Sequence, residues 1–195
     1  MRGILLFCLL LFFGCARQVV TPQKQAEADQ KAIVSIQKVL VGLPLVQEAP
    51  QAAAREIESE AHLIATSLVN QTRETNEEFN MTTGPKWHNF LIKIGARKKG
   101  YCYEWVPELL KALPSPPMKY FERHWGGSFL SLGRENNAVI ITKRGAALET
   151  GLVYDAWRGS GHPFWILVSQ DKKYSWMERF TEMEILTGQA RVEPK

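Results

Sequence analysis

The sequence predicts an α+β fold in which helices come first and an antiparallel meander follows. Three strand-like runs support the meander. They cover residues 138–142, 151–157 and 164–169, and turn sequences rich in glycine and basic residues separate them. Two helical patterns precede these runs. Roughly 115 residues, from about residue 80 onward, are enough for one compact domain.

The first helical pattern covers residues 52–79. Ile57, Ile64 and Leu68 share one stripe along it, and mostly acidic and polar residues occupy the other faces. The turn-forming sequence Thr82–Pro85 follows and ends this helix. The pattern therefore predicts an amphipathic helix that lies ahead of the main domain.

The second helical pattern follows Cys102. Trp105, Leu109 and Leu113 recur every four residues, and Pro114 stops the pattern. An internal proline is tolerated well only in the first turn of a helix, and one lies five residues after the cysteine. We therefore expect this helix to begin close to Cys102.

The N-terminus has the parts of a secretory signal. Arg2 precedes the apolar run Ile4–Phe13, which is too short to span a bilayer, and Gly14 and Cys15 follow. This junction resembles a bacterial lipobox, in which a cysteine after a small residue becomes the lipidated N-terminus. The resemblance implies a membrane partner through lipid on Cys15. An ordinary secretory signal with bystander cysteines is the alternative.

The segment after Cys15 is polar and is interrupted by Gly42, Pro44 and Pro50. It could carry a helix, but we expect it to offer little core and to act as a tether. The predicted organisation is a signal peptide at 1–14, a lipidated tether at 15–51, a helical segment at 52–80 and the α+β domain at 81–195.

Charge and motifs exclude several classes of function. Removal of Arg2 with the signal takes Lys+Arg from 24 to 23, so against 20 acidic residues the mature chain carries about +3. The basic residues form no stripe interleaved with aromatics, so we expect no nucleic-acid binding. There is no CxxC, HExxH or paired Cys/His cluster, and we expect no metal or other cofactor.

Cys102 is the residue with the clearest chemical potential. Cys8 is removed with the signal and Cys15 carries lipid, so Cys102 has no partner in the mature chain. At a helix N-terminus, free amides and the helix dipole stabilise a thiolate and lower its pKa. The alternative is a buried cysteine that acts as a small hydrophobic residue.

The segment Gly100-Tyr101-Cys102, the following strand from Asn136 and the next strand with Asp155 resemble the core of transglutaminase-like and papain-like cysteine proteins. The resemblance covers roughly residues 86–177. It implies that Cys102 is the nucleophile, that a base lies on the first strand and that Asp155 orients the base. Asp155 could instead pair with Arg158 or cap the glycine-rich turn after it.

The histidine of this pattern belongs near Asn136. An amide cannot take up a proton as a general base at neutral pH. His124, placed in a loop between the helix and the first strand, is the candidate substitute, since it could swing beside Cys102. We expect Cys102 to face the strand of Asp155, with Asn136 at the entry of the neighbouring strand. His62, His88 and His162 are expected to be surface or structural histidines.

Three readings follow from this site. The preferred one is a degenerate domain that kept the fold, lost the base and binds a peptide, glycan or protein partner. The second is an active cysteine hydrolase or acyl transferase that acts on amides in the cell envelope. The third is a structural lipoprotein that docks through the helix at 52–79. The lipidated cysteine is followed by Ala16 and not by the Asp that commonly retains lipoproteins at the inner membrane. Resemblance to lipoprotein sorting in double-membraned bacteria therefore implies the outer membrane, with the domain in the periplasm.

Overall fold

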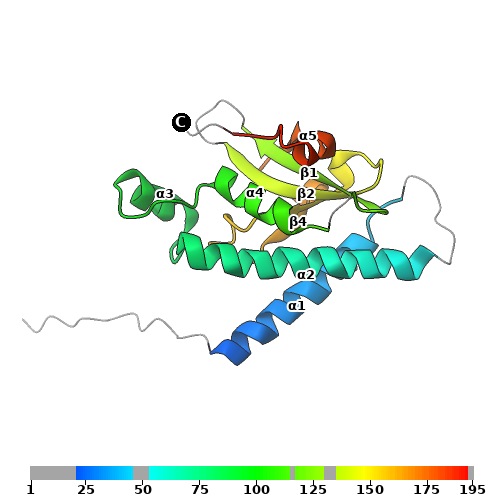
Figure 1. The fold of residues 1–195 in the computed structure, drawn as a ribbon, viewed down its shortest axis with the longest axis horizontal. Helices are drawn as coiled ribbons and strands as arrows, with labels where there is room; N and C mark the ends of the chain where they lie inside the picture. The colour runs from blue at the N-terminus through cyan, green and yellow to red at the C-terminus, as the bar shows by residue number, and fades with distance from the viewer. Residues whose placement is uncertain (1–20, 46–52, 115–116, 130–134, 193–195) are drawn as a thin grey trace, which may run out of the picture.

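The computed structural model describes residues 21–45, 53–114, 117–129 and 135–192 (Figure 1). Within these ranges the fold is mixed α+β, with five α-helices and a five-stranded antiparallel sheet. The helices are α1 (Pro22–Val41), α2 (Ala54–Phe79), α3 (Pro85–Lys93), α4 (Cys102–Ala112) and α5 (Glu182–Leu186). The strands are β1 (Phe121–Ser128), β2 (Asn136–Lys143), β3 (Leu152–Tyr154), β4 (Trp165–Leu167) and β5 (Met177–Phe180).

The strands lie in the order β4-β3-β2-β1-β5, and every pairing is antiparallel. Strands β2, β3 and β4 correspond to the three predicted runs, so the predicted meander is confirmed there. Strand β3 ends at Tyr154, earlier than predicted, because Asp155 begins a tight turn that closes with hydrogen bonds from Gly159 and Gly161 to the preceding carbonyls. The sheet has two faces, and α4 packs against one of them (Figure 1).

Strand β1 lies where the sequence analysis placed a loop. Its side chains alternate: Phe121 and Trp125 face the helices and join the main core, whereas Gly126, which pairs with Ala138, lies on the other face beneath the Ile140 side chain. A Cβ at Gly126 would lie 2.4 Å from Ile140 Cδ1, so this glycine allows close packing and does not mark a turn. The charged and glycine residues of this segment hid its strand character.

Helix α2 begins and ends close to the predicted bounds. Ile57, Ile64 and Leu68 are all buried, as the periodicity predicts, and they pack in one core with α1, α4 and the sheet. Asn80 follows the last residue of α2 and adopts the left-handed conformation (φ 49°). The backbone amide of Asn80 donates to the Asn76 carbonyl.

Helix α1 differs from the expected tether. Ile36 and Leu40 are fully buried and pack against α2 in the main core, with Ile33 beside them. The helix begins after Thr21, whose hydroxyl accepts a hydrogen bond from the Lys24 amide. Its many polar residues cover the exposed faces and mask a short apolar stripe. Residues 22–41 therefore belong to the folded unit.

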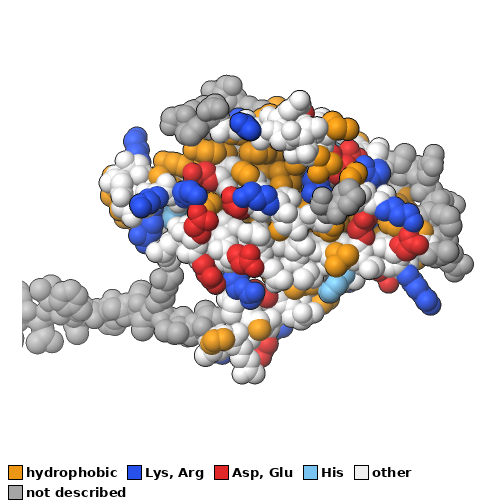
Figure 2. All heavy atoms as spheres, in the orientation of Figure 1, with side chains coloured by type: hydrophobic (Ala, Val, Ile, Leu, Met, Phe, Trp, Pro, Cys, Tyr) orange, Lys and Arg blue, Asp and Glu red, His pale blue; other side chains and the backbone are white. Residues whose placement is uncertain are grey.

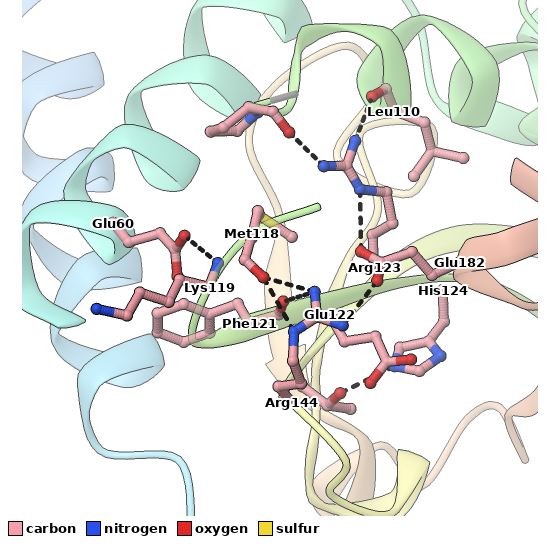
Figure 3. Close-up of polar contacts among 12 residues, drawn as sticks. Glu60, Leu110, Met118, Lys119, Phe121, Glu122, Arg123, His124, Arg144 and Glu182 are labelled. Carbon is pink, nitrogen blue, oxygen red and sulfur yellow. Dashed lines mark hydrogen bonds and ion pairs between the residues drawn. The ribbon is translucent and has the colours of Figure 1, made fainter. Parts of the chain in front are cut away.

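A buried ionic cluster fixes the C-terminal helix to the sheet (Figure 3). The Glu182 carboxylate of α5 lies 3.5 Å from Arg123 Nε of β1 and 3.0 Å from Arg144 Nη1. Arg123 extends toward α4 and donates to the carbonyls of Leu110 and Pro114. Figure 3 shows that Arg123 and its neighbour His124 project to opposite sides of β1.

Candidate functional site

Cys102 is the first residue of α4 and is buried against the entry of β2. Its thiol donates to the Glu135 carbonyl oxygen, with 3.6 Å between Sγ and O. The side-chain amide of Asn137 donates to the sulfur, with 3.7 Å between Nδ2 and Sγ. Asn137 is therefore the residue that occupies the position facing the cysteine.

Asn136 points to the other face of the sheet, which differs from the expected arrangement. Side chains alternate along β2, so Asn136 shares the face of Ala138 and Ile140, away from α4. Its Nδ2 donates to Asp155 Oδ2 at 2.7 Å, and its Oδ1 accepts from the backbone amide of Asn137. A chain of hydrogen bonds thus runs from Cys102 through Asn137 and Asn136 to Asp155.

The side chain of Asn137 has all four of its hydrogen-bonding positions filled. Its Oδ1 accepts from Trp125 Nε1 and from Arg179 Nη1, both at 2.9 Å. Its Nδ2 donates to Glu135 Oε1 and to Cys102 Sγ. Because the two donors define the oxygen, the orientation of this amide follows from the network itself. Such an amide positions its neighbours but accepts no proton.

Arg179 of β5 covers this network. Its Nη1 lies 2.8 Å from Glu135 Oε1 and bonds Asn137 at the same time. Asn137, Glu135 and Arg179 were not predicted as site residues. Alternation along the strand starting at Asn136 could have indicated Asn137, because Val139 and Ile141 would then face the helix with it. The contribution of β5 carried no comparable signal.

The environment of Cys102 disfavours a thiolate. Burial, with a smaller contribution from the charges of Asp155 and Glu135, raises the pKa of the Cys102 thiol to about 11, against the lowering effect of the Asn137 hydrogen bonds. The Glu104 carboxylate accepts hydrogen bonds from the amides of Gly100 (2.7 Å) and Tyr101 (2.9 Å). The negative charge of Glu104 already neutralises the partial positive charge at the N-terminus of α4, which would otherwise stabilise a Cys102 thiolate.

A loop position would have allowed His124 to lie beside Cys102, but the structure places it elsewhere. It is buried on β1, on the face away from α4, where Nε2 lies 2.8 Å from Thr142 Oγ1 and Nδ1 lies 2.6 Å from Glu178 Oε1. The strand fixes this orientation, since His124 pairs with Ile140 across the sheet. His124 is therefore on the wrong side of the sheet to act on the cysteine.

The other three histidines lie away from Cys102 and contact other parts of the fold. His88 of α3 is fully buried and its Nε2 lies 2.9 Å from the Lys99 carbonyl oxygen, behind Gly100. His62 of α2 lies at the surface, with Nδ1 3.1 Å from Gln37 Oε1. His162 lies in the turn after Asp155, beside the helix pair α1 and α2. Among the described residues, no histidine is hydrogen-bonded to the cysteine.

Asp155 is buried at the end of β3. Its Oδ1 accepts from the backbone amide of Arg158 at 2.8 Å, so it caps the glycine-rich turn. Burial raises the pKa of the Asp155 carboxyl to about 6, against the lowering effect of its hydrogen bonds from Arg158 and Asn136. The Arg158 guanidinium pairs with Asp171 instead (2.6 Å).

A cleft of about 380 Å³ opens beside this site. It is lined by Lys86, Asn89, Phe129, Glu135, Trp157, Lys173 and Tyr174. Trp157 is largely buried and donates to Asn89 Oδ1 at 3.1 Å, which ties the floor of the cleft to α3. The wall combines two cations, one carboxylate and three aromatic rings. Such a lining suits a ligand with polar groups on a partly apolar body.

Comparisons with protein-family models, with curated proteins and with solved structures find no match to this chain. Within the described ranges, no group of three or more His, Cys, Asp or Glu side chains is placed to hold a metal ion. The helices in those ranges include none that is long and apolar enough to cross a membrane. Cys15 and the predicted signal peptide lie outside the described residues.

Proposed function

We propose that this chain is a membrane-anchored envelope lipoprotein whose transglutaminase- or papain-like domain binds a peptide or glycan and does not cleave it. The observation that carries the proposal is the contact between Asn137 and Cys102. In a working thiol enzyme this position must hold a proton acceptor. Here it holds an amide whose donors and acceptors are all in use.

The packing of α4 against β2 supports the finer fold proposal. A cysteine at a helix N-terminus faces the first residues of a strand, and an acid directly follows the next strand. This is the order that the family resemblance implies. The departures are the missing base and the acid that turns to the far face of the sheet, where Asn136 holds it.

The surroundings of the thiol also support binding over catalysis. Nucleophilic attack requires a thiolate, and Cys102 carries a pKa raised to about 11. Glu104 occupies the amides that precede the helix, Gly100 and Tyr101. Hydrolysis of an amide also needs a general acid that protonates the leaving amine. Such an acid typically increases the rate by about 10²–10⁴-fold, and Asn137 cannot supply the proton.

The proposed ligand site is the cleft beside the cysteine. Phe129 is 41% exposed at its edge and Tyr174 and Trp157 provide further ring surface. Lys173 offers a cation for a carboxylate. Peptide carboxylates and the apolar faces of sugars are the ligand groups that this lining fits best.

Titration with soluble peptidoglycan fragments, which carry both a peptide and a disaccharide, tests the proposal. We expect saturable binding by calorimetry to the full chain, weakened in Lys173→Glu and Phe129→Ser. The matched controls are Lys31→Glu and Leu63→Ser, which change exposed residues on α1 and α2. Mass spectrometry should recover the fragments intact. Absence of binding, or cleavage that Cys102→Ala abolishes, would refute a binding role.

The membrane anchor has its own test. If Cys15 carries lipid, Cys15→Ser should release the chain from the membrane fraction or block its processing. Unchanged fractionation and a mature mass without acyl chains would contradict the anchor. Density-gradient separation of the two membranes then tests the outer-membrane location suggested by Ala16.

The structure disfavours the third reading, in which α2 docks on another component. The stripe of α2 that would make the contact is already buried by α1 and α4. Ile64 and Leu68 have no exposed surface, and Ile57 is 6% exposed. A partner would have to displace part of this core to reach them.

A further inference from the structure

Helix α3 exposes an apolar stripe. Trp87, Phe90 and Ile94 are 55%, 45% and 58% exposed, and their spacing places them on one side of the helix. The rings of Trp87 and Phe90 contact each other, with centroids 5.0 Å apart. The opposite side of α3 faces the protein, where His88 is fully buried. The stripe is therefore not part of the core.

Basic residues surround this stripe. Residues 85–100 contain five of them, Lys86, Lys93, Arg97, Lys98 and Lys99, and no acidic residue. Lys86 and Lys93 are exposed and follow the same side of α3, seven residues apart. Lys99 pairs with Glu78 at 2.8 Å. The segment therefore joins an exposed aromatic stripe to a concentrated positive charge.

The position of α3 leaves the stripe accessible. Figure 1 shows α3 at one end of the molecule, beyond the C-terminal end of α2 and away from the sheet. In Figure 2, Lys and Arg side chains surround hydrophobic side chains at this end. A flat surface could contact the stripe without meeting the rest of the fold.

We propose that α3 docks on an anionic lipid surface, with Trp87, Phe90 and Ile94 inserted at the level of the headgroups. Indole and phenyl rings favour this interface, and clustered cations bind the negative surface of anionic membranes. A protein partner would need a complementary acidic rim around an apolar pocket. A bilayer of anionic lipids offers negative charge and an apolar interior over its whole area. Its negative surface also suits a segment that has no acidic residue to repel it.

This docking goes beyond the proposed ligand binding and does not depend on it. It would, however, orient the domain. Lys86 and Asn89 of α3 also line the cleft beside Cys102. Docking through the neighbouring stripe would therefore hold the cleft close to the membrane surface, and would restrict the orientation of a domain that is also tethered if the proposed lipid anchor is present.

Tryptophan quenching by brominated lipids tests the docking on the full chain. The chain is mixed with vesicles that contain brominated lipid and consist of one part phosphatidylglycerol and two parts phosphatidylcholine, or of phosphatidylcholine alone. We expect quenching on the anionic vesicles, loss of most of it in Trp87→Phe, and loss of it in Lys93→Glu/Lys98→Glu. High salt should reduce it, because the cations are exposed. Lys31→Glu/Lys38→Glu and Met183→Ser are the matched controls.

All variants keep the same N-terminal segment, so a lipid or signal anchor contributes equally to each. Quenching that Trp87→Phe does not remove would overturn the docking. Equal quenching on both vesicle types, unaffected by the charge reversals, would overturn the anionic preference. A dimer in solution that Phe90→Ser dissociates would instead assign the stripe to a second copy of the chain, and would also overturn the proposal.

Discussion

Asn137 Nδ2 lies 3.7 Å from Cys102 Sγ, at the position where the proposed transglutaminase-like domain would hold its base. The amide cannot rotate to present another atom, because Trp125 and Arg179 both donate to its oxygen. The sulfur in turn donates to the Glu135 carbonyl and behaves as a buried thiol. These contacts make Cys102 a packed, hydrogen-bonded residue of the domain.

The first prediction concerns the reactivity of this thiol. Iodoacetamide should alkylate native Cys102 much more slowly than the denatured chain at neutral pH, because burial raises its pKa to about 11. The measurement is the alkylation rate against pH, read by peptide mass so that Cys8 and Cys15 are counted separately. Rapid alkylation with a midpoint below neutrality would restore the enzyme reading.

The second prediction separates the two neighbouring asparagines. Asn137→His should increase the alkylation rate at neutral pH and lower its midpoint, because the imidazole would contact the sulfur. Asn136→His should leave the rate unchanged, since position 136 faces Asp155. His124→Ala should also leave it unchanged, because His124 lies on the far face. Circular dichroism checks that each variant is folded. Equal responses in the two histidine variants would contradict the assignment of faces.

Periodicity predicted the elements whose two sides differ clearly. Helix α2 has apolar residues at helical spacing on one side, and it was found close to its predicted bounds. Strand β2 was instead predicted by its run of consecutive apolar residues, in agreement with its burial on both faces. Strand β1 was missed because Arg123 is buried on it, paired with Glu182, which lies 59 residues further along the chain (182 − 123), and bonded to backbone carbonyls of α4 and the residues after it. No local pattern reports such a partner. Helix α1 was undervalued because its apolar stripe is short.

The site was predicted only in outline. The helix start at Cys102 followed from residue spacing and is confirmed. Its facing residue was assigned one position away, at Asn136, and a shift of one residue in a strand moves the side chain to the other face. The side chains that saturate Asn137 come from β1 and β5, and their approach depends on strand order. Sequence alone does not fix that order.

The third prediction tests Asp155 through pH. Its folded pKa, raised to about 6, lies above the unfolded value of 3.8, so its contribution to stability is present below pH 3.8 and is lost as pH rises through 6. The difference in unfolding free energy between wild type and Asp155→Asn should therefore fall by about 1–3 kcal/mol across this window. Urea titrations at pH 3.5 to 7.5 measure it. A constant difference would place the ionised carboxylate in a solvated site.

The fourth prediction concerns Gly100, which precedes the cysteine helix. Its φ is +123°, and a Cβ there would lie 2.4 Å from His88 Nε2. Gly100→Ala should lower the unfolding free energy by about 1–3 kcal/mol, because it combines backbone strain with a clash. Gly84→Ala is the control, since Gly84 has φ −57° and open space around it. Equal effects of the two substitutions would show that α3 yields to accommodate the added methyl group.

The last prediction concerns Lys143, a buried lysine at the end of β2. It is 1% exposed, and its ammonium lies 4.1 Å from the ring centroid of Phe121, with no hydrogen-bond acceptor among the described residues. Burial lowers the pKa of Lys143 to about 8, which the charge of Glu60 only partly opposes. The folded state then binds fewer protons than the unfolded state between pH 8 and 10.5, so stability rises with pH across that window.

At neutral pH the charged form carries the full cost of its burial. Lys143→Met should therefore raise the unfolding free energy at pH 7 by about 1–2 kcal/mol, after allowance for the lost cation–π contact. The gain should shrink as pH rises from 8 toward 10.5, because the folded wild-type amine then becomes neutral and no longer carries the cost of a buried charge. Urea titrations at pH 7 and pH 10 measure it, with Lys31→Met as the surface control. A variant no more stable than wild type at pH 7 would mean that Glu60 or water compensates the buried ammonium.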